Sequence, residues 1–190
     1  MSPDKRDSSV KSFEVTRCQW LNTADQEYVE YHDKEWGKPI MNDDRLYEAL
    51  MLECFQAGLS WKCILRKRAA FWLAFDNWEA STVATYNADK INSLMENPDI
   101  IRHRGKIVAA IINARIFLDI QSEYGSFEAY IRKFTGHIII RDHHNTPSSA
   151  ARNISKHLKK LGMKFTGPST IHSFLQATGF INAHDPCCFL

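Results

Sequence analysis

Residues 46–68 read LYEALMLECFQAGLSWKCILRKR and contain the pattern that decides the predicted fold. Apolar residues recur there at helical spacing, which predicts a helix packed into a core: Leu46, Tyr47, Leu50, Met51, Cys54 and Phe55. Glu53 lies among them, where a carboxylate is costly to bury unless a group binds it. Gly58 is expected to end this helix and Ser60 to cap the next one, which begins with Trp61. The two helices thus form a tight corner with Glu53 on one side and Trp61 on the other. Either this corner presents Glu53 and Trp61 to a ligand, or Glu53 reaches solvent while Trp61 joins the core.

Helical periodicity continues through the rest of the chain, and no alternating stretch is long enough to predict a strand. The central helix should run from a cap at Asn42 or Asp43 to about residue 57. The other expected helices cover residues 24–36, 60–75, 79–85, 88–97, 126–134, 148–161 and 170–177, with a further one that starts after residue 101. The sequence therefore predicts an all-α fold of about eight to ten helices.

Composition describes an ordinary globular chain of 190 residues, whose net charge of +2 is too small to indicate a nucleic-acid partner. The five cysteines are odd in number, and no apolar stretch resembles a secretory signal or a membrane span. We therefore expect a cytoplasmic protein with reduced thiols and no membrane partner. Residues 1–16 are polar and aperiodic, which predicts a disordered tail before a single helical domain over 17–190. Nothing in the sequence indicates an oligomer, so we expect a monomer.

A second informative stretch, residues 97–115, reads NPDIIRHRGKIVAAIINAR. Pro98 should end the preceding helix, and a short turn then leads into a new helix. Arg102, His103, Arg104 and Lys106 crowd the start of this helix, where cations oppose the helix dipole. Cations beside free backbone N–H groups make an anion site, for which a DNA phosphate is the natural ligand. The alternative is a solvated run of charges without a ligand.

Zinc-ligand side chains occur at both ends of the chain. Cys18 and His32 lie near the start, while His184 and Cys188 lie close to the end, with Cys187 as a competing ligand. Two thiolates and two imidazoles would fill a tetrahedral zinc shell and leave no position for water. Such a zinc would be structural and would tie the C-terminal tail to the first helix. The spacing by itself also fits idle cysteines near a terminus.

Several stretches, in this order, resemble the bacterial 3-methyladenine DNA glycosylase I family of the helix-hairpin-helix superfamily. They are RCQW, EYVEYHDKEWGKP, LYEALMLECFQAGLSW, IIRHRGKI, LKKLGMKFTGPSTIHSFLQATG and INAHDPCC. The resemblance runs from Arg17 to about Phe189. It implies an all-helical enzyme that removes methylated bases from DNA, with a structural Zn²⁺ held by Cys18, His32, His184 and Cys188.

The resemblance also implies roles for individual residues. Glu53 would line the base pocket as its catalytic-site carboxylate, with Trp61 stacked on the base and Tyr31 on the other side. Aromatics that would border the pocket are Tyr28, Trp20 and Trp36. The DNA-holding hairpin and the helix behind it would include Ile100, Ile101, Arg102, Arg104 and Lys106. Two positions depart from the family pattern: Asp99 stands where the hairpin usually has glycine, and His172 where tyrosine is common.

The implied substrate is alkylated double-stranded DNA, and the product is free 3-methyladenine. Methylation at N3 leaves a cationic purine that is already a good leaving group, so we expect an ionised Glu53 to recognise the base instead of acting as a strong base. No obvious Schiff-base lysine accompanies the pocket motifs, which predicts a monofunctional glycosylase without strand cleavage. Two other functions remain open: a non-catalytic, zinc-stabilised DNA-binding module, and a zinc-dependent hydrolase with water in place of one ligand.

Overall fold

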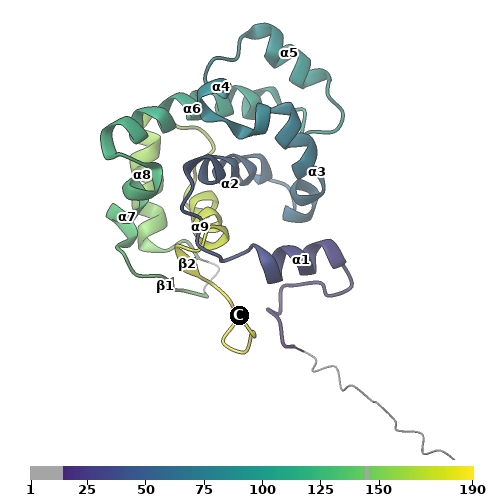
Figure 1. Cartoon of the computed structure of the whole chain (residues 1–190), viewed down its shortest axis with the longest axis vertical. Helices are drawn as coiled ribbons and strands as arrows, with labels where there is room; N and C mark the ends of the chain where they lie inside the picture. The colour runs from purple at the N-terminus through teal and green to yellow at the C-terminus, as the bar shows by residue number, and fades with distance from the viewer. Residues whose placement is uncertain (1–14, 144–145) are drawn as a thin grey trace, which may run out of the picture.

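The computed structural model describes residues 15–143 and 146–190, and these fold into helices with very little sheet (Figure 1). The α-helices are α1 (Gln26–Lys34), α2 (Asp43–Gln56), α3 (Trp61–Ala74), α4 (Ala80–Val83), α5 (Ala88–Glu96), α6 (Arg104–Tyr124), α7 (Phe127–Thr135), α8 (Ser149–Leu161) and α9 (Pro168–Ala177). A 3-10 turn, η1 (Asp76–Trp78), follows α3. Within the described ranges, the mainly helical class predicted from sequence is confirmed, and the helix count lies inside the expected range.

Helix α2 lies at the centre of the molecule, between α3, α6, α7 and α9 (Figure 1). Its apolar residues belong to one hydrophobic core that extends from Leu46 to Ala183. Asn42 caps the helix, because its side chain accepts a hydrogen bond from the backbone N–H of Arg45 at 3.0 Å. Helix α2 is thus buried on most sides, which explains why a polar residue on it needs a specific environment.

One feature that the sequence did not predict is a pair of parallel strands, β1 (Ile140–Arg141) and β2 (Ile181–Asn182). Ile140 pairs with Ile181 and Arg141 with Asn182. Two residues are too few to show an alternating pattern, so hydropathy could not reveal these strands. The pair anchors the segment after α7 against the segment after α9.

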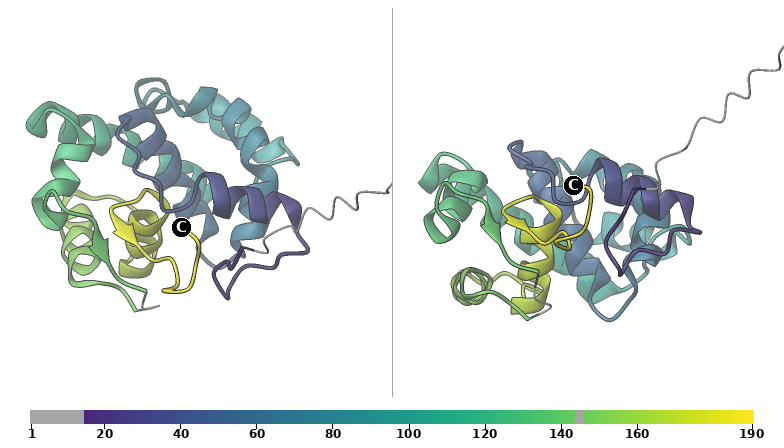
Figure 2. Two further views of the ribbon diagram at one scale, coloured as in Figure 1. Left: turned by 60° about the horizontal axis from the view of Figure 1, so that its bottom comes forward. Right: turned by 90° about the horizontal axis from the view of Figure 1, so that it is seen from below.

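The two ends of the described chain lie side by side, with the C-terminal tail next to α1 in all three views (Figures 1 and 2). The backbone N–H of Phe189 donates to the carbonyl of Thr16 at 2.9 Å. Of the predicted disordered tail, residues 1–14 lie outside the described residues, while Thr16 is held against the C-terminal tail. Among the helices of the described chain, none is both long and apolar enough to cross a membrane.

Helices α5 and α6 are joined by residues 97–103, the predicted hairpin. Lys67 of α3 braces this turn, since its Nζ donates to the carbonyls of Pro98 at 3.2 Å and Asp99 at 3.1 Å. Ile100 is buried in the core. The backbone of Asp99 does not adopt a positive φ, so this turn accommodates aspartate in place of glycine without strain.

Candidate functional site

The α2–α3 corner buries the carboxyl group of Glu53, which is only 5% exposed. Of the two interpretations of the sequence, the one in which Glu53 reaches solvent is therefore wrong. Its Oε2 has no hydrogen-bond partner in the protein, and burial raises the pKa of Glu53 to about 8. Gly58 turns the chain with a φ of +82°, and Ser60 caps α3 by accepting from the N–H of Cys63. This turn places Trp61 close to Glu53, and the indole Nε1 of Trp61 is likewise buried without a partner.

A cavity of about 460 Å³ opens onto this corner. Six of its lining residues are those that the sequence analysis assigned to a base pocket: Trp20, Tyr28, Tyr31, Trp36, Glu53 and Trp61. They come from the segment before α1, from α1 and the turn after it, and from the two helices of the corner. The structure therefore brings together residues that are spread over the first third of the sequence. A concave site with aromatic walls and one buried carboxyl group is typical of a ligand pocket.

The aromatic rings of the cavity contact one another in a continuous wall. The ring centroids of Tyr31 and Trp61 are 5.3 Å apart and tilted by 42°, and those of Tyr28 and Tyr31 are 6.5 Å apart and nearly parallel. A flat ring sandwiched between two others needs about 7 Å between them. Tyr31 and Trp61 would therefore have to separate by a small movement before a base could lie between them.

Other polar residues of the cavity were not predicted. They are Gln19, Gln56, His143, Ser173, Gln176 and Asp185. Gln56 follows Glu53 by three positions on α2, so helical spacing could have placed it on the same face. His143 is exposed in the loop after β1 and lines the cavity from there, while its neighbours His144 and Asn145 lie outside the described residues. His172, which stands where the family commonly has tyrosine, is buried, and its Nε2 lies 3.1 Å from the amide nitrogen of Gln176.

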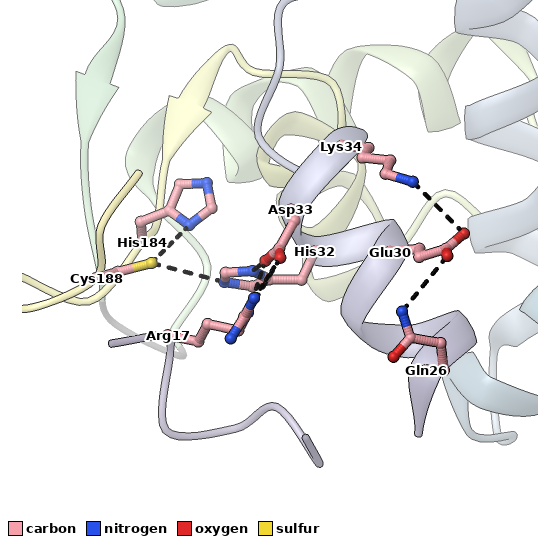
Figure 3. A network of polar contacts seen from close by, with 8 residues as sticks. All are labelled: Arg17, Gln26, Glu30, His32, Asp33, Lys34, His184 and Cys188. Carbon is pink, nitrogen blue, oxygen red and sulfur yellow. Dashed lines mark hydrogen bonds and ion pairs between the residues drawn. The ribbon is translucent and has the colours of Figure 1, made fainter. Parts of the chain in front are cut away.

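Beside this cavity, Cys18, His32, His184 and Cys188 form a cluster whose ligand atoms all lie within 4.8 Å of one another. Figure 3 shows three of them, His32, His184 and Cys188. The Sγ of Cys188 is 3.7 Å from His32 Nε2 and 3.7 Å from His184 Nδ1, and the Sγ of Cys18 is 3.6 Å from His184 Nδ1. The edges of a tetrahedral zinc site with these donors are about 3.3–3.8 Å long. The donor set and its spacing thus fit a tetrahedral metal ion, and the cluster contains Cys188 while Cys187 is exposed.

A carboxylate orients one histidine of the cluster (Figure 3). Asp33 Oδ1 lies 2.8 Å from His32 Nδ1, and Arg17 holds the carboxylate by three hydrogen bonds of 2.8–3.1 Å. An Nδ1–H that donates to Asp33 leaves Nε2 of His32 free to bind a metal. Asp33 and Arg17 were not predicted as part of the site, although Asp33 follows His32 directly in the sequence.

The Cys/His cluster and the cavity share a wall of aromatic rings. The centroid of Trp36 lies 4.6 Å from that of His184 and 4.9 Å from that of Trp20, and Trp20 lies 5.4 Å from His32. Two residues of the cavity wall, Trp20 and Trp36, therefore pack against imidazoles of the cluster.

The start of α6 carries the predicted DNA-contacting residues, but they differ in exposure. Arg102 and Arg104 are exposed, whereas Ile100 is buried and Ile101 is half-buried. Lys106 is only 6% exposed, although we expected it among the surface cations. Its Nζ donates to the carbonyls of Phe55 at 2.7 Å and Ala57 at 2.6 Å, at the end of α2. The carbonyls at a helix end have no partners within the helix, and this explains why a lysine is drawn inward there.

Comparison with known proteins identifies this arrangement. The sequence pattern of the family described as "Methyladenine glycosylase" matches residues 20–190. "DNA-3-methyladenine glycosylase 1" of Escherichia coli (strain K12) is 37% identical over 183 residues, which cover 92% of this chain and 97% of that protein. A crystal structure of 3-methyladenine DNA glycosylase I superimposes with a TM-score of 0.86 at 36% identity, covering 92% of this chain and 98% of the other. A structure of a variant of 3-methyladenine DNA glycosylase I in complex with 3-methyladenine gives a TM-score of 0.84 at 36% identity, covering 88% of this chain and 93% of that one. The chain therefore belongs to the methyladenine glycosylase family.

Proposed function

We propose that this protein is a DNA repair glycosylase that flips 3-methyladenine out of alkylated double-stranded DNA and hydrolyses its N-glycosidic bond. The observation that carries the proposal is the buried, unpaired carboxyl group of Glu53 beside the aromatic wall of the cavity. A base inside the duplex stack cannot be reached, so it has to be extruded into such a pocket at a cost of a few kcal/mol. Tyr31, Trp61 and their aromatic neighbours supply faces that attract a cationic ring.

Glu53 recognises the extruded base. Since its pKa is raised to about 8, the carboxyl group of the empty pocket is mostly protonated at pH 7, in contrast to the ionised group expected from the sequence. A cationic purine beside it favours the charged form and lowers this pKa, so the carboxyl group releases its proton as the cation enters. Glu53 then attracts the positive charge and accepts hydrogen bonds from the purine edge.

Hydrolysis neutralises the purine. The bond between the sugar C1′ and the purine nitrogen breaks, and its electron pair stays on the purine, which becomes neutral 3-methyladenine. Water adds to C1′ and loses a proton to solvent, which leaves an abasic site. The protein contributes by selecting the cation and by presenting C1′ to water, because the leaving group is already activated by its charge. The loss of this charge weakens the attraction to Glu53 and to the aromatic faces and thus favours product release.

The two lysines nearest to the pocket motifs support a monofunctional reaction. Lys62 forms an ion pair with Asp25, and Lys106 is occupied by the carbonyls of Phe55 and Ala57. No lysine is found among the described residues that line the cavity. A Schiff base with the sugar needs an amine within reach, so we expect base removal without strand cleavage.

The helix-hairpin-helix element of the proposal consists of α5, residues 97–103 and α6. Exposed Arg102 and Arg104 flank the first turn of α6, and two cations at the N-terminal end of a helix suit a DNA phosphate. Ile100 and Ile101 anchor the hairpin in the core. Lys106 supports this surface from inside.

The cofactor of the proposal is a structural Zn²⁺ held by Cys18, His32, His184 and Cys188. Four protein ligands leave no open coordination position for water, so the ion stabilises the fold and takes no part in hydrolysis. It would join the segment before α1, and α1 itself, to the C-terminal tail. Reduced thiols at this site agree with a cytoplasmic enzyme. We also expect a monomer, which size-exclusion chromatography with light scattering can check.

The test is release of bases from methylated duplex DNA, followed by chromatography, with the wild type beside Glu53→Gln and Glu48→Gln. Glu48 is a matched control, because it is also buried on α2 but does not line the cavity. We expect selective release of 3-methyladenine by the wild type and by Glu48→Gln. Glu53→Gln should lose at least about 100-fold in rate, together with its affinity for the free base, as expected when several interactions of the bound base are lost.

Two outcomes would contradict the proposal. Loss of hydrolysis by Glu53→Gln with intact binding of free 3-methyladenine would show that Glu53 drives the chemistry and is not mainly a recognition group. No base release by folded, zinc-loaded wild type that still binds duplex DNA would favour the non-catalytic DNA-binding module.

A further inference from the structure

Phe165, in the segment between α8 and α9, combines an exposed aromatic ring with a strained backbone. Its side chain is 38% exposed, and its φ is +57°, in the left-handed region. A bulky residue in this region is an outlier that costs on average more than glycine would. Phenylalanine at this position therefore does not stabilise the local backbone, and its ring is not fully buried in the core.

Buried side chains from three helices hold this strained segment in place. Asn113 of α6 binds both backbone groups of Lys164, accepting from its N–H at 2.8 Å and donating to its carbonyl at 3.0 Å. Cys54 of α2 donates its thiol to the carbonyl of Phe165 at 3.6 Å, and Ser155 of α8 donates to that of Thr166 at 2.7 Å. Asn113, Cys54 and Ser155 are each at most 3% exposed. The core thus fixes the backbone that carries the Phe165 ring.

The ring lies next to the start of α6. It contacts the ring of His103 edge to face at 6.2 Å, and it borders an apolar hollow floored by residues of α6 such as Val108 and Ile112. Exposed Arg104 and Lys164 flank the same hollow. The ammonium of Lys106 lies 6.0 Å from the centre of the Phe165 ring and 2.6 Å from the carbonyl of Ala57. Phe165 therefore lies between the proposed DNA-binding hairpin and the corner that opens onto the cavity.

We propose that Phe165 is a DNA-contacting residue, whose ring packs against the flat apolar surface of a nucleoside in the duplex that the hairpin holds. The inference rests on the proposed function, because it takes alkylated DNA as the partner. Cations that suit phosphates flank the hollow, and its floor and the Phe165 ring are apolar, which suits the sugar or base between phosphates. The core fixes the strained backbone so that the ring keeps this position.

The experiment measures the affinity for a duplex that contains an abasic site, by fluorescence anisotropy, for the wild type and three variants. Phe165→Ala and Phe165→Gly both remove the ring, and Leu73→Ala removes an exposed apolar side chain of α3 that lies beside Arg45. We expect both Phe165 variants to bind DNA about 5- to 100-fold more weakly, as is typical of a lost aromatic–nucleoside contact. Leu73→Ala should bind as the wild type does. The salt dependence should stay unchanged at Phe165, because no phosphate contact is lost.

Two further readouts separate a DNA contact from a structural role. Phe165→Gly should have a higher Tm than Phe165→Ala, because glycine relieves the positive φ, yet the two should lose equal DNA affinity. Affinity for free 3-methyladenine should remain that of the wild type in both. Equal DNA affinity of wild type and Phe165→Ala would overturn the inference, and so would a loss that follows Tm instead of the ring. If the wild type itself fails to bind the duplex or to release 3-methyladenine, the proposed function fails instead.

Discussion

The cavity and the cluster of Cys18, His32, His184 and Cys188 lie side by side, but their polar groups differ in whether they have partners. In the cavity, Glu53 Oε2 and Trp61 Nε1 are buried without partners. In the cluster, three pairs of ligand atoms lie 3.6–3.7 Å apart, like the edges of a tetrahedral zinc site, and Asp33 orients His32. A buried group without a partner costs free energy until a ligand satisfies it. The difference indicates that the cavity is prepared for a transient ligand, whereas the cluster is prepared for a permanent one.

Both regions depend on segments that are distant in the sequence. The cluster joins the segment before α1 to the C-terminal tail, and its histidines pack against Trp20 and Trp36 of the cavity wall. The cavity in turn depends on the α2–α3 corner, which Lys106 of α6 holds from behind. The two regions share this wall, but the other residues on which they depend differ, and the predictions below use these residues to separate stability from base recognition.

Removal of the metal should give the largest effect. Structural zinc contributes on the order of 10 kcal/mol to folding in small domains, so a strong chelator should lower the Tm markedly and loosen the C-terminal tail. Thermal unfolding with measured zinc content is the test, and Cys188→Ser should behave like chelated protein. Cys187→Ser is the matched control and should retain one zinc and the wild-type Tm. If chelation abolished turnover but left the Tm unchanged, the zinc would be catalytic and the comparison would fail.

Glu53 should give the next largest effect, seen as a dependence of stability on pH. Its pKa is about 8 in the folded protein and about 4.5 in an unfolded chain, so between these values only the folded state retains the proton. Raising the pH through this window therefore lowers the free energy of unfolding by about 1.4 kcal/mol per unit, or about 3 kcal/mol in total by pH 7. Urea unfolding at several pH values should show this component in the wild type and lack it in Glu53→Gln. The exposed Glu96→Gln is a control that should keep it.

If the difference in stability between wild type and Glu53→Gln were the same at pH 5 and pH 7, the carboxyl group would not be held protonated by the cavity. The unpaired state of Glu53 would then carry no energetic cost, and the cavity would resemble the cluster in having its polar groups satisfied.

The sequence predicted best where the pattern is local. Helical spacing located α2 and α3, and Asn42, Ser60 and Gly58 act at their ends as expected. Glu53 stood out because its carboxylate lies among apolar residues at helical spacing, a conflict visible within a single helix.

Features that depend on distant contacts were not predictable in this way. The pairing of β1 with β2 joins residues 140 and 181 through two residues each, too short for any periodic signal. Lys106 resembled a surface cation because its partners, the carbonyls that end α2, lie far away in the sequence. The left-handed backbone of Phe165 is likewise imposed by buried side chains of three other segments.

Lys106 gives the smallest expected effect and sharpens the comparison from the side of the cavity. In Lys106→Met, the carbonyl of Phe55 stays buried without a donor, while that of Ala57 lies at an exposed residue and can bind water. One unsatisfied buried carbonyl costs about 1–3 kcal/mol, so the free energy of unfolding should fall by about 2 kcal/mol. Affinity for free 3-methyladenine should also fall, because the corner that carries Glu53 and Trp61 loses its support.

The control is Arg102→Met, which should leave both quantities unchanged but reduce the slope of log K for DNA against log salt by about 0.9, as one lost phosphate contact does. If Lys106 positions the corner, Lys106→Met should leave the salt slope of DNA binding unaltered. A reduced slope together with normal affinity for the free base would instead show that Lys106 contacts DNA.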